Sequence, residues 1–275
     1  MKYQGIYFMK KTLISLAVAA GAVMSVSSVA NAYTPSFSNG DISLGGTIST
    51  PMQAALYEGK VGSLSGLDAT IPVGASTVTI AAPANAGLLA LRSVAGGFNN
   101  TVSDKIANIT FNGVSLLDAA SGDSFSNGAI QMTLDVQDDT GSAIGDVVFP
   151  MQVAAVITTE TNGDVWGTSM FASADTHAFY GGLPTSASQA VTLYSDAVNV
   201  MNGLFSDVTA NLPQITRESA RGAEVKNFAL ADAVFNTAYA AGIVMGENIT
   251  INLDNPATTG SVAWTASMPI VVTYK

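Results

Sequence analysis

The sequence predicts a mostly β fold of the sandwich type, and three observations support this. Apolar and polar residues alternate with a period of two in many short runs, which is typical of half-buried strands. The segments between these runs are rich in Gly, Asn and Asp, which are common turn residues. Only 11% of the residues are charged, against about 25% in an ordinary globular domain. Closely packed strands joined by polar turns would account for this composition.

Strands are expected wherever the alternation persists. The first covers residues 41–49, and its apolar face carries Ile42, Leu44, Gly46 and Ile48. The last run ends at the C-terminus, where Ile270, Val272 and Tyr274 share one face. The strands expected after the first one cover residues 70–81, 88–94, 105–111, 129–136, 145–156, 233–243, 248–253 and 261–274. Residues 233–241 contain alanines that also favour a helix, but their alternation favours a strand.

A turn and a helix interrupt the series of strands. Asp138-Asp139-Thr140-Gly141 lies between two alternating runs and predicts a hairpin turn. A helix is expected over residues 195–210, because Ser195 can cap it and Asp196 suits its first turn. Its apolar stripe consists of Ala197, Val200, Met201, Leu204, Phe205 and Val208. The region from about residue 158 to 228 breaks the strand rhythm and is interpreted as an insertion.

Residues 1–32 have the features of a removable signal peptide. Lys10 and Lys11 precede an apolar run from Leu13 to Met24, and Ala30-Asn31-Ala32 is a small-residue cleavage site. The apolar run of 12 residues is shorter than the roughly 20 residues of a membrane-spanning helix. The chain is therefore expected to be exported, with Tyr33 as the first mature residue.

The mature chain is strongly acidic and contains no cysteine. It carries seven basic and 20 acidic side chains, a formal net charge of −13. This charge argues against nucleic acid and anionic lipid as partners. Without disulfides, the exported protein must be stabilised by packing and strand pairing.

Candidate catalytic and metal-binding groups are few. His177 is the only histidine, and no nucleophile elbow, zinc-binding histidine pair or phosphate-binding loop is evident. Asp135, Asp138, Asp139 and Asp146 cluster around one turn, but their spacing does not match an EF-hand. We therefore expect no enzymatic activity, metal or cofactor.

The apolar terminal strands allow two interpretations. In β-strand addition, an extended segment pairs with an open sheet edge, and its alternate side chains fill pockets in the exposed core. Residues 41–49 could be such a donated segment, with Gly46 where the backbone must approach closely. They could equally be the ordinary first strand of a complete domain. The alternation by itself leaves both interpretations open.

Four segments carry a resemblance to a known family. They are Met9-Lys10-Lys11-Thr12-Leu13-Ile14, the stretch from Asn39 to Ile48, Phe179-Tyr180-Gly181-Gly182-Leu183, and Trp264-Thr265-Ala266 with the strand that follows. Together they resemble the kappa-class chaperone–usher fimbrial subunits, in which the major pilus subunit is also the adhesin. The likeness covers the mature chain in order and is weakest between Thr185 and Asn227.

This resemblance implies an immunoglobulin-like sandwich that lacks its last strand. Residues 33–49 would be an N-terminal donor extension, and residues 50–275 would form the pilin domain with its insertion. A periplasmic chaperone would first occupy the open groove, and the extension of the next identical subunit would replace it at an outer-membrane usher. Ile42, Leu44, Gly46 and Ile48 would be the donor residues, and Ile270, Val272 and Tyr274 would line the accepting edge. The chain departs from the family pattern in ending with Lys275 after Tyr274.

The resemblance also implies a cell-surface fimbria whose inserted segment binds host carbohydrate on glycoconjugates. Trp166, Phe171, Phe179 and Tyr180 could stack on a sugar ring. They could instead form the small core of the insertion. An alternative function is a secreted carbohydrate-binding β-sandwich that does not polymerise.

Overall fold

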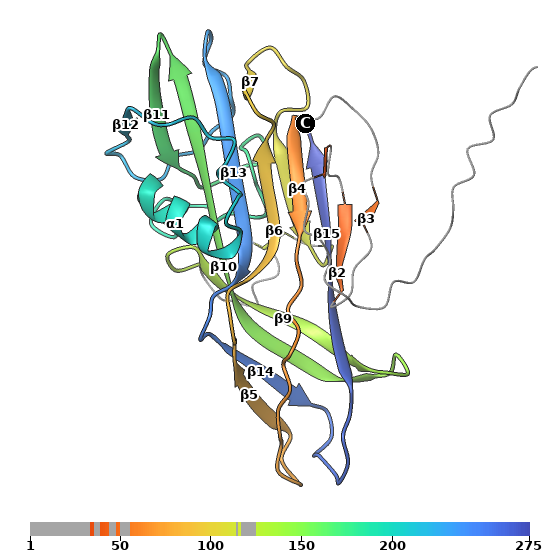
Figure 1. Cartoon of the computed structure of the whole chain (residues 1–275). Helices are drawn as coiled ribbons and strands as arrows, with labels where there is room; N and C mark the ends of the chain where they lie inside the picture. Colours follow the sequence, from red (N-terminus) through yellow and green to blue (C-terminus); the bar gives the residue numbers. More distant parts are fainter. Residues whose placement is uncertain (1–33, 36–38, 44–47, 50–55, 114, 117–124) are drawn as a thin grey trace, which may run out of the picture. The chain divides into compact units, whose positions relative to one another are not determined.

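The computed structural model describes residues 34–35, 39–43, 48–49, 56–113, 115–116 and 125–275 (Figure 1). The predicted signal peptide lies outside these residues. The strands are β1 (Thr34–Pro35), β2 (Asn39–Ser43), β3 (Ile48–Ser49), β4 (Tyr57–Val61), β5 (Thr77–Ala81), β6 (Ala86–Ser93), β7 (Phe98–Asn99), β8 (Ala107–Phe111), β9 (Ala129–Asp138), β10 (Ala143–Thr161), β11 (Asp164–Ser169), β12 (Arg217–Glu218), β13 (Val234–Ile243), β14 (Asn248–Leu253) and β15 (Trp264–Tyr274). The helix in the described part of the chain is α1 (Tyr194–Leu204).

The predicted mostly β class is confirmed. The strands form a curled sheet with the order β1-β4-β6-β13-β10-β9-β15-β2-β3, and each neighbouring pair in this series is antiparallel. The curl brings β4 and β15 close to each other, because the rings of Tyr57 and Tyr274 stack with centroids 5.5 Å apart. Two strands that are distant in the order thus share one core.

β10 has 19 residues and joins two regions of the sheet. Its first part pairs with β9 on one edge and β14 on the other, and its last part pairs with β13 and β11. Figure 1 shows this strand running from the β9–β14 region up to the β11–β13 region. The strand continues through residue 158, where the sequence pattern suggested that an insertion begins.

The burial pattern of β10 explains its sequence. Val147, Phe149 and Met151 alternate with less buried residues, as expected for a strand with one face on the core. From Val153 to Thr158 every residue is buried. Both faces are covered there, because α1 packs on one side and the main core lies on the other. An uninterrupted apolar run is the sequence signature of such a doubly covered strand.

A second, smaller core lies between α1 and the sheet. The sheet contributes mainly small residues, Ala90, Ala154, Ala238 and Ala240, which allow the helix to approach closely. The apolar stripe predicted for the helix is largely buried, and its members Ala197, Met201, Leu204, Phe205 and Val208 belong to this core.

Three local predictions need correction. The helix ends at Leu204, because Phe205 has an extended backbone with φ −140°. The N-cap residue is Leu193 and not the predicted Ser195, and no side-chain hydrogen bond caps the helix. The Ser195 hydroxyl instead donates to Glu218 Oε1 at 3.4 Å. The strand expected over 70–81 covers only 77–81, since the backbone N–H of Ala75 donates to the carbonyl of Pro72 in a turn.

Candidate interface at the terminal strands

β15 contacts three strands along its length. Trp264–Ala266 pair with β9, Ile270–Tyr274 pair with β8, and Ser267–Val271 pair with β2. Ile270 and Val271 have partners in both β2 and β8, so these two strands lie on opposite edges of β15. β2, close to the N-terminal end of the described chain, and the last strand, β15, are therefore direct neighbours.

Alternate side chains of β15 point into the core. Ala266, Met268, Ile270 and Val272 are buried, and Tyr274 is partly buried and packs against the same core. Thr265, Ser267, Val271 and Thr273 are exposed. The apolar face expected for Ile270, Val272 and Tyr274 is thus present, and it continues toward the start of the strand.

Tyr57 closes one end of the space between β4 and β15. Its ring stacks on Tyr274, and its hydroxyl donates to the carbonyl of Lys105 at 2.6 Å. Burial raises the pKa of both hydroxyls well above the ordinary value of tyrosine, because a phenolate would be poorly solvated there. The two rings stay neutral over the whole physiological pH range.

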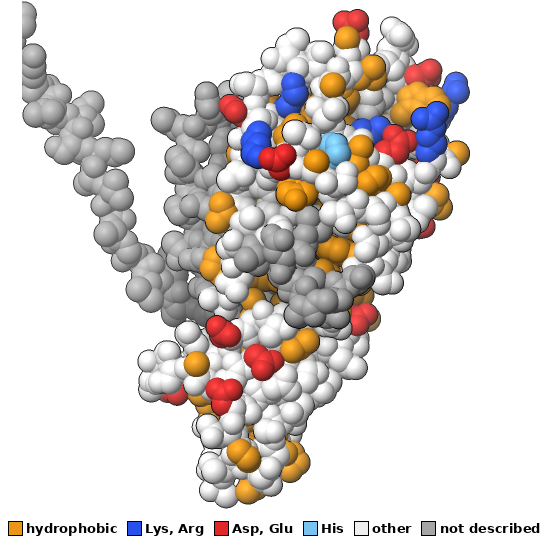
Figure 2. Space-filling model, turned by 180° about the vertical axis from the view of Figure 1, so that it is seen from behind, with side chains coloured by type: hydrophobic (Ala, Val, Ile, Leu, Met, Phe, Trp, Pro, Cys, Tyr) orange, Lys and Arg blue, Asp and Glu red, His pale blue; other side chains and the backbone are white. Residues whose placement is uncertain are grey.

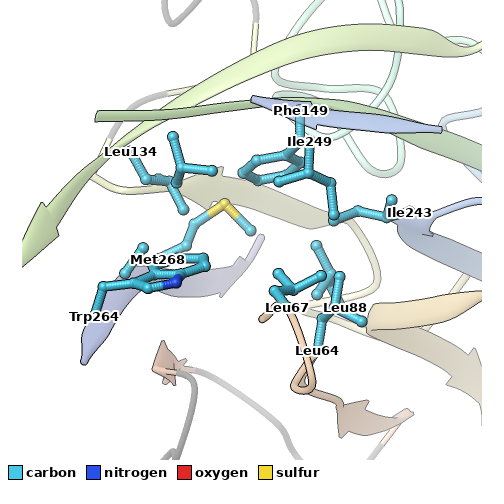
Figure 3. Close-up of a pocket in the computed structure, with 11 residues that line it drawn as sticks. Leu64, Leu67, Leu88, Leu134, Phe149, Ile243, Ile249, Trp264 and Met268 are labelled. Atoms are coloured by element: carbon cyan, nitrogen blue, oxygen red, sulfur yellow. The ribbon is translucent and has the colours of Figure 1, made fainter. Parts of the chain in front are cut away.

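An apolar pocket lies beside the other half of β15 (Figure 3). Trp264, Ala266 and Met268 form one wall, and Leu64 and Leu67, which follow β4 in the chain, contribute another part of its lining. The remaining lining residues are Leu88, Leu134, Val147, Phe149, Ile243 and Ile249. The cavity has a volume of about 50 Å³ and a wholly apolar set of lining side chains.

A larger hollow of about 470 Å³ lies next to the start of β15. It shares Trp264 with the apolar pocket and is also lined by Ile71, Val262 and Leu253. Val73 and Val262 are 70% and 67% exposed, and Figure 2 shows hydrophobic side chains at this end of the molecule. The start of β15 is therefore flanked by a hollow that has both polar and apolar lining residues.

The predicted donor residues divide between described and undescribed parts of the chain. Ile42 lies on β2 opposite Met268, and Ile48 lies on β3 opposite Gly40. Leu44 and Gly46 lie outside the described residues. The single strand expected over 41–49 is wrong for this state, because β3 pairs back on β2 and does not continue along β15.

The four aromatic residues considered for sugar binding do not share one surface. Trp166 is 39% exposed on β11, and the guanidinium carbon of Arg217 on β12 lies 5.3 Å from its ring centroid. Phe171 and Tyr180 are partly buried. The ring of Phe179 is fully buried, 5.3 Å from the ring of Tyr239 between centroids. Of the four, Trp166 is the most exposed.

The Phe179-Tyr180-Gly181-Gly182 segment forms backbone hydrogen bonds with β8. The backbone N–H of Phe179 donates to the carbonyl of Ala107, and the N–H of Ile109 donates to the carbonyl of Tyr180 at 2.8 Å. Gly181 has φ +83°, and a Cβ at this position would overlap the carbonyl oxygen of Ile109. The sequence pattern did not predict this structural role, although glycine is the usual residue where two backbones approach closely.

Charged groups in the described residues serve mainly structural contacts. Asp138 Oδ1 accepts hydrogen bonds from Thr140 and Ser142, which lower the pKa of the carboxyl and confirm the predicted turn. His177 Nδ1 lies 3.3 Å from Ser173 Oγ.

Within the described ranges, no group of three acidic or histidine side chains is arranged to hold a metal ion. Figure 2 shows Lys and Arg side chains gathered at one end of the visible face.

In the part of the chain that the structure describes, no helix is long and apolar enough to cross a lipid bilayer.

Comparison with known proteins gives one consistent result. Residues 9–275 match the sequence profile of a family described as fimbrial, major and minor subunit. K88 fimbrial proteins AB and AD of Escherichia coli are each 29% identical to this chain, and F41 fimbrial protein of the same species is 25% identical. Each alignment covers 97% of this chain and 100% of the relative.

Proposed function

The chain belongs to the family of major and minor fimbrial subunits, and from this premise we propose that it polymerises by donating its N-terminal segment to β15 of a neighbouring copy. The relatives are fimbrial proteins, which fits the expectation that the chain is not an enzyme. In the proposed filament, residues 33–49 of one subunit complete the sheet of the next.

The observation that supports this proposal is the pairing of β2 with the outer edge of β15. This edge accepts an extended N-terminal segment in antiparallel orientation, with Ile42 opposite Met268. A fully extended donor in the same register would place Leu44 opposite Ala266 and Gly46 opposite Trp264. Ala266 and Trp264 both line the apolar pocket, so Leu44 would fill it and Gly46 would fit beside the indole ring. Burial of Leu44 would contribute about 1.5–3 kcal/mol.

The same proposal assigns the partners. A periplasmic chaperone covers the β15 edge before assembly, and an outer-membrane usher exchanges it for the next subunit. The filament is then a homopolymer on the cell surface. Ile270, Val272 and Tyr274, on the inward face of β15, help to form the groove that receives the donor.

A pair of charge substitutions tests the donor assignment. Leu44→Asp places a carboxylate in the apolar pocket, whereas Ser43→Asp is a matched change opposite the exposed Ser267. We expect filaments by electron microscopy with Ser43→Asp and none with Leu44→Asp. Equal filament yield from both variants would show that the segment is not donated in this register.

We also propose that the filament binds host carbohydrate through Trp166. The indole is exposed beside Arg217, and the exposed Asp164 lies two residues away on β11, so an apolar ring face and polar groups occur together. Trp166→Ala should abolish binding of intact filaments on a glycan array. Leu230→Ala, at a site that is 55% exposed, serves as the control and should bind normally. Retained binding by Trp166→Ala would remove Trp166 from the site.

One observation favours a second candidate function. β2 and β15 pair within one chain, as they would in a complete, non-polymerising carbohydrate-binding domain. Electron microscopy of cells that also produce the chaperone and usher separates the two candidates, since filaments contradict the second.

A further inference from the structure

The structure places the donor segment and the accepting edge in contact within a single chain. β2 covers β15 from Ser267 to Val271 with five residue pairs. A donor from another copy would need this same edge, and β2 itself would be needed to donate. Within the described chain, the pairing of β2 with β15 therefore occupies both the donor strand and the accepting edge that polymerisation would use.

The intramolecular contact is shorter than a full donor contact would be. β3 pairs with β2, so Ile48 lies opposite Gly40 and away from the line of β15. β2 does not pair with Trp264, Thr265 or Ala266. These residues pair with β9. Two of them line the apolar pocket, so the closed arrangement uses only part of the surface that a fully extended donor would cover.

We propose that a subunit released from its chaperone closes on itself before it joins a filament, and that this closed state neither donates nor accepts a strand. The inference rests on the donor-strand function proposed above. Closure is intramolecular, and only residues 50–56 separate β3 from β4, so the effective concentration of β2 near β15 is high. Exchange with a neighbour replaces the β2–β15 pairs within one chain by the same pairs between two chains, as in domain swapping. The added contacts of the fully extended donor then favour the polymer.

The closed state makes assembly a competition. Closure does not depend on protein concentration, whereas addition to a filament does. Isolated subunits should therefore persist as monomers at low concentration, although both assembly surfaces belong to the same molecule. Opening of β2 is then a required step before a subunit can join a filament.

A disulfide staple tests this directly, because the chain contains no cysteine. Ser43 and Ser267 are directly opposite each other, and Ser267 is exposed. Opposite residues of antiparallel strands have Cα atoms about 4.5–5.5 Å apart, within the range of a disulfide. Ser43→Cys/Ser267→Cys is therefore a nearly isosteric staple. Ser43→Cys/Thr273→Cys is the matched control, since Thr273 is exposed on the same strand but pairs with Asn108.

The staple is applied to mature monomers that have been purified free of chaperone from cells without usher, and separately to finished filaments. We expect oxidised monomers to form an intrachain disulfide and oxidised filaments to form an interchain ladder on non-reducing gels. Stapled monomers should not extend filament seeds, and a reducing agent should restore extension at least tenfold. The control pair should form neither product.

The outcomes separate this inference from the donor-strand function. An interchain ladder in filaments without an intrachain disulfide in monomers overturns the closed state and leaves the donor function intact. Extension of seeds by stapled monomers at the unstapled rate also overturns it. An intrachain disulfide in every preparation, with no ladder, contradicts the donor function and with it any gating by closure.

Discussion

Two buried tyrosines, Tyr57 on β4 and Tyr239 on β13, predict a loss of stability at alkaline pH. Tyr57 and Tyr239 are 1% and 0% exposed, and burial raises the pKa of both hydroxyls above the ordinary value of 10. Below pH 10 both rings are neutral in the folded and unfolded chain, so they cause no pH dependence. Above pH 10 only the unfolded chain ionises them, which favours unfolding. At pH 11 this costs about 1.4 kcal/mol for each ring, or about 2.8 kcal/mol together.

A double variant isolates this effect. Tyr57→Phe/Tyr239→Phe removes the hydroxyl donors to Lys105 and Gly182 and should cost about 2 kcal/mol at pH 8. The variant cannot ionise at these positions, so its stability should fall less between pH 10 and 11. Urea unfolding followed by circular dichroism should show the parent more stable at pH 8 and the two proteins nearly equal at pH 11. Parallel stability curves across this range would refute the assignment of the alkaline loss to these two rings.

Three further predictions concern single sites. Gly181→Ala should lower stability by about 1–3 kcal/mol, because φ is +83° and the added Cβ meets the carbonyl of Ile109; thermal melting checks this, and an unchanged Tm contradicts it. Asp207→Ala should lower the free energy of unfolding, measured by urea titration, by about 1–3 kcal/mol, because the carboxylate contacts the buried Lys60 ammonium at 2.8 Å. Asp207→Glu, which keeps the charge, is the control and should cause a smaller loss. Asp138→Ala should make the free energy of unfolding less dependent on pH in the acid range. Hydrogen bonds lower the pKa of Asp138 in the folded protein, so its stabilising contribution is present above the unfolded-state pKa and is lost as the pH falls. Identical midpoints of acid unfolding for the parent and the variant would disprove this.

The sequence pattern predicted strands best where one face lies on the core and the other is exposed. β9 and β14 follow this pattern, and their observed bounds lie close to the expected ranges. The pattern overestimated the strand before residue 77, because Val73 sits in a turn and is 70% exposed despite its apolar character. Alternation records the polarity of side chains, and it does not show whether a partner strand is available.

The candidate site was less predictable, because its geometry depends on distant partners. The apolar face of Ile270, Val272 and Tyr274 was readable from local alternation alone. The buried position of Phe179 depends on packing against Tyr57 and Tyr239, which are far from it in the sequence. The exposure of an aromatic side chain is set by such tertiary contacts, so composition could not separate Trp166 from Phe179.

The length of β10 has a practical consequence for dissecting the protein. The strand runs from the β9 hairpin into the region that carries α1, without a loop at residue 158. A fragment of residues 158–228 would lack most of β10 and all of β6 and β13, whose alanines form the floor under the helix. Such a fragment should behave as an unfolded peptide, readily digested by trypsin. Experiments on this region therefore need the intact subunit.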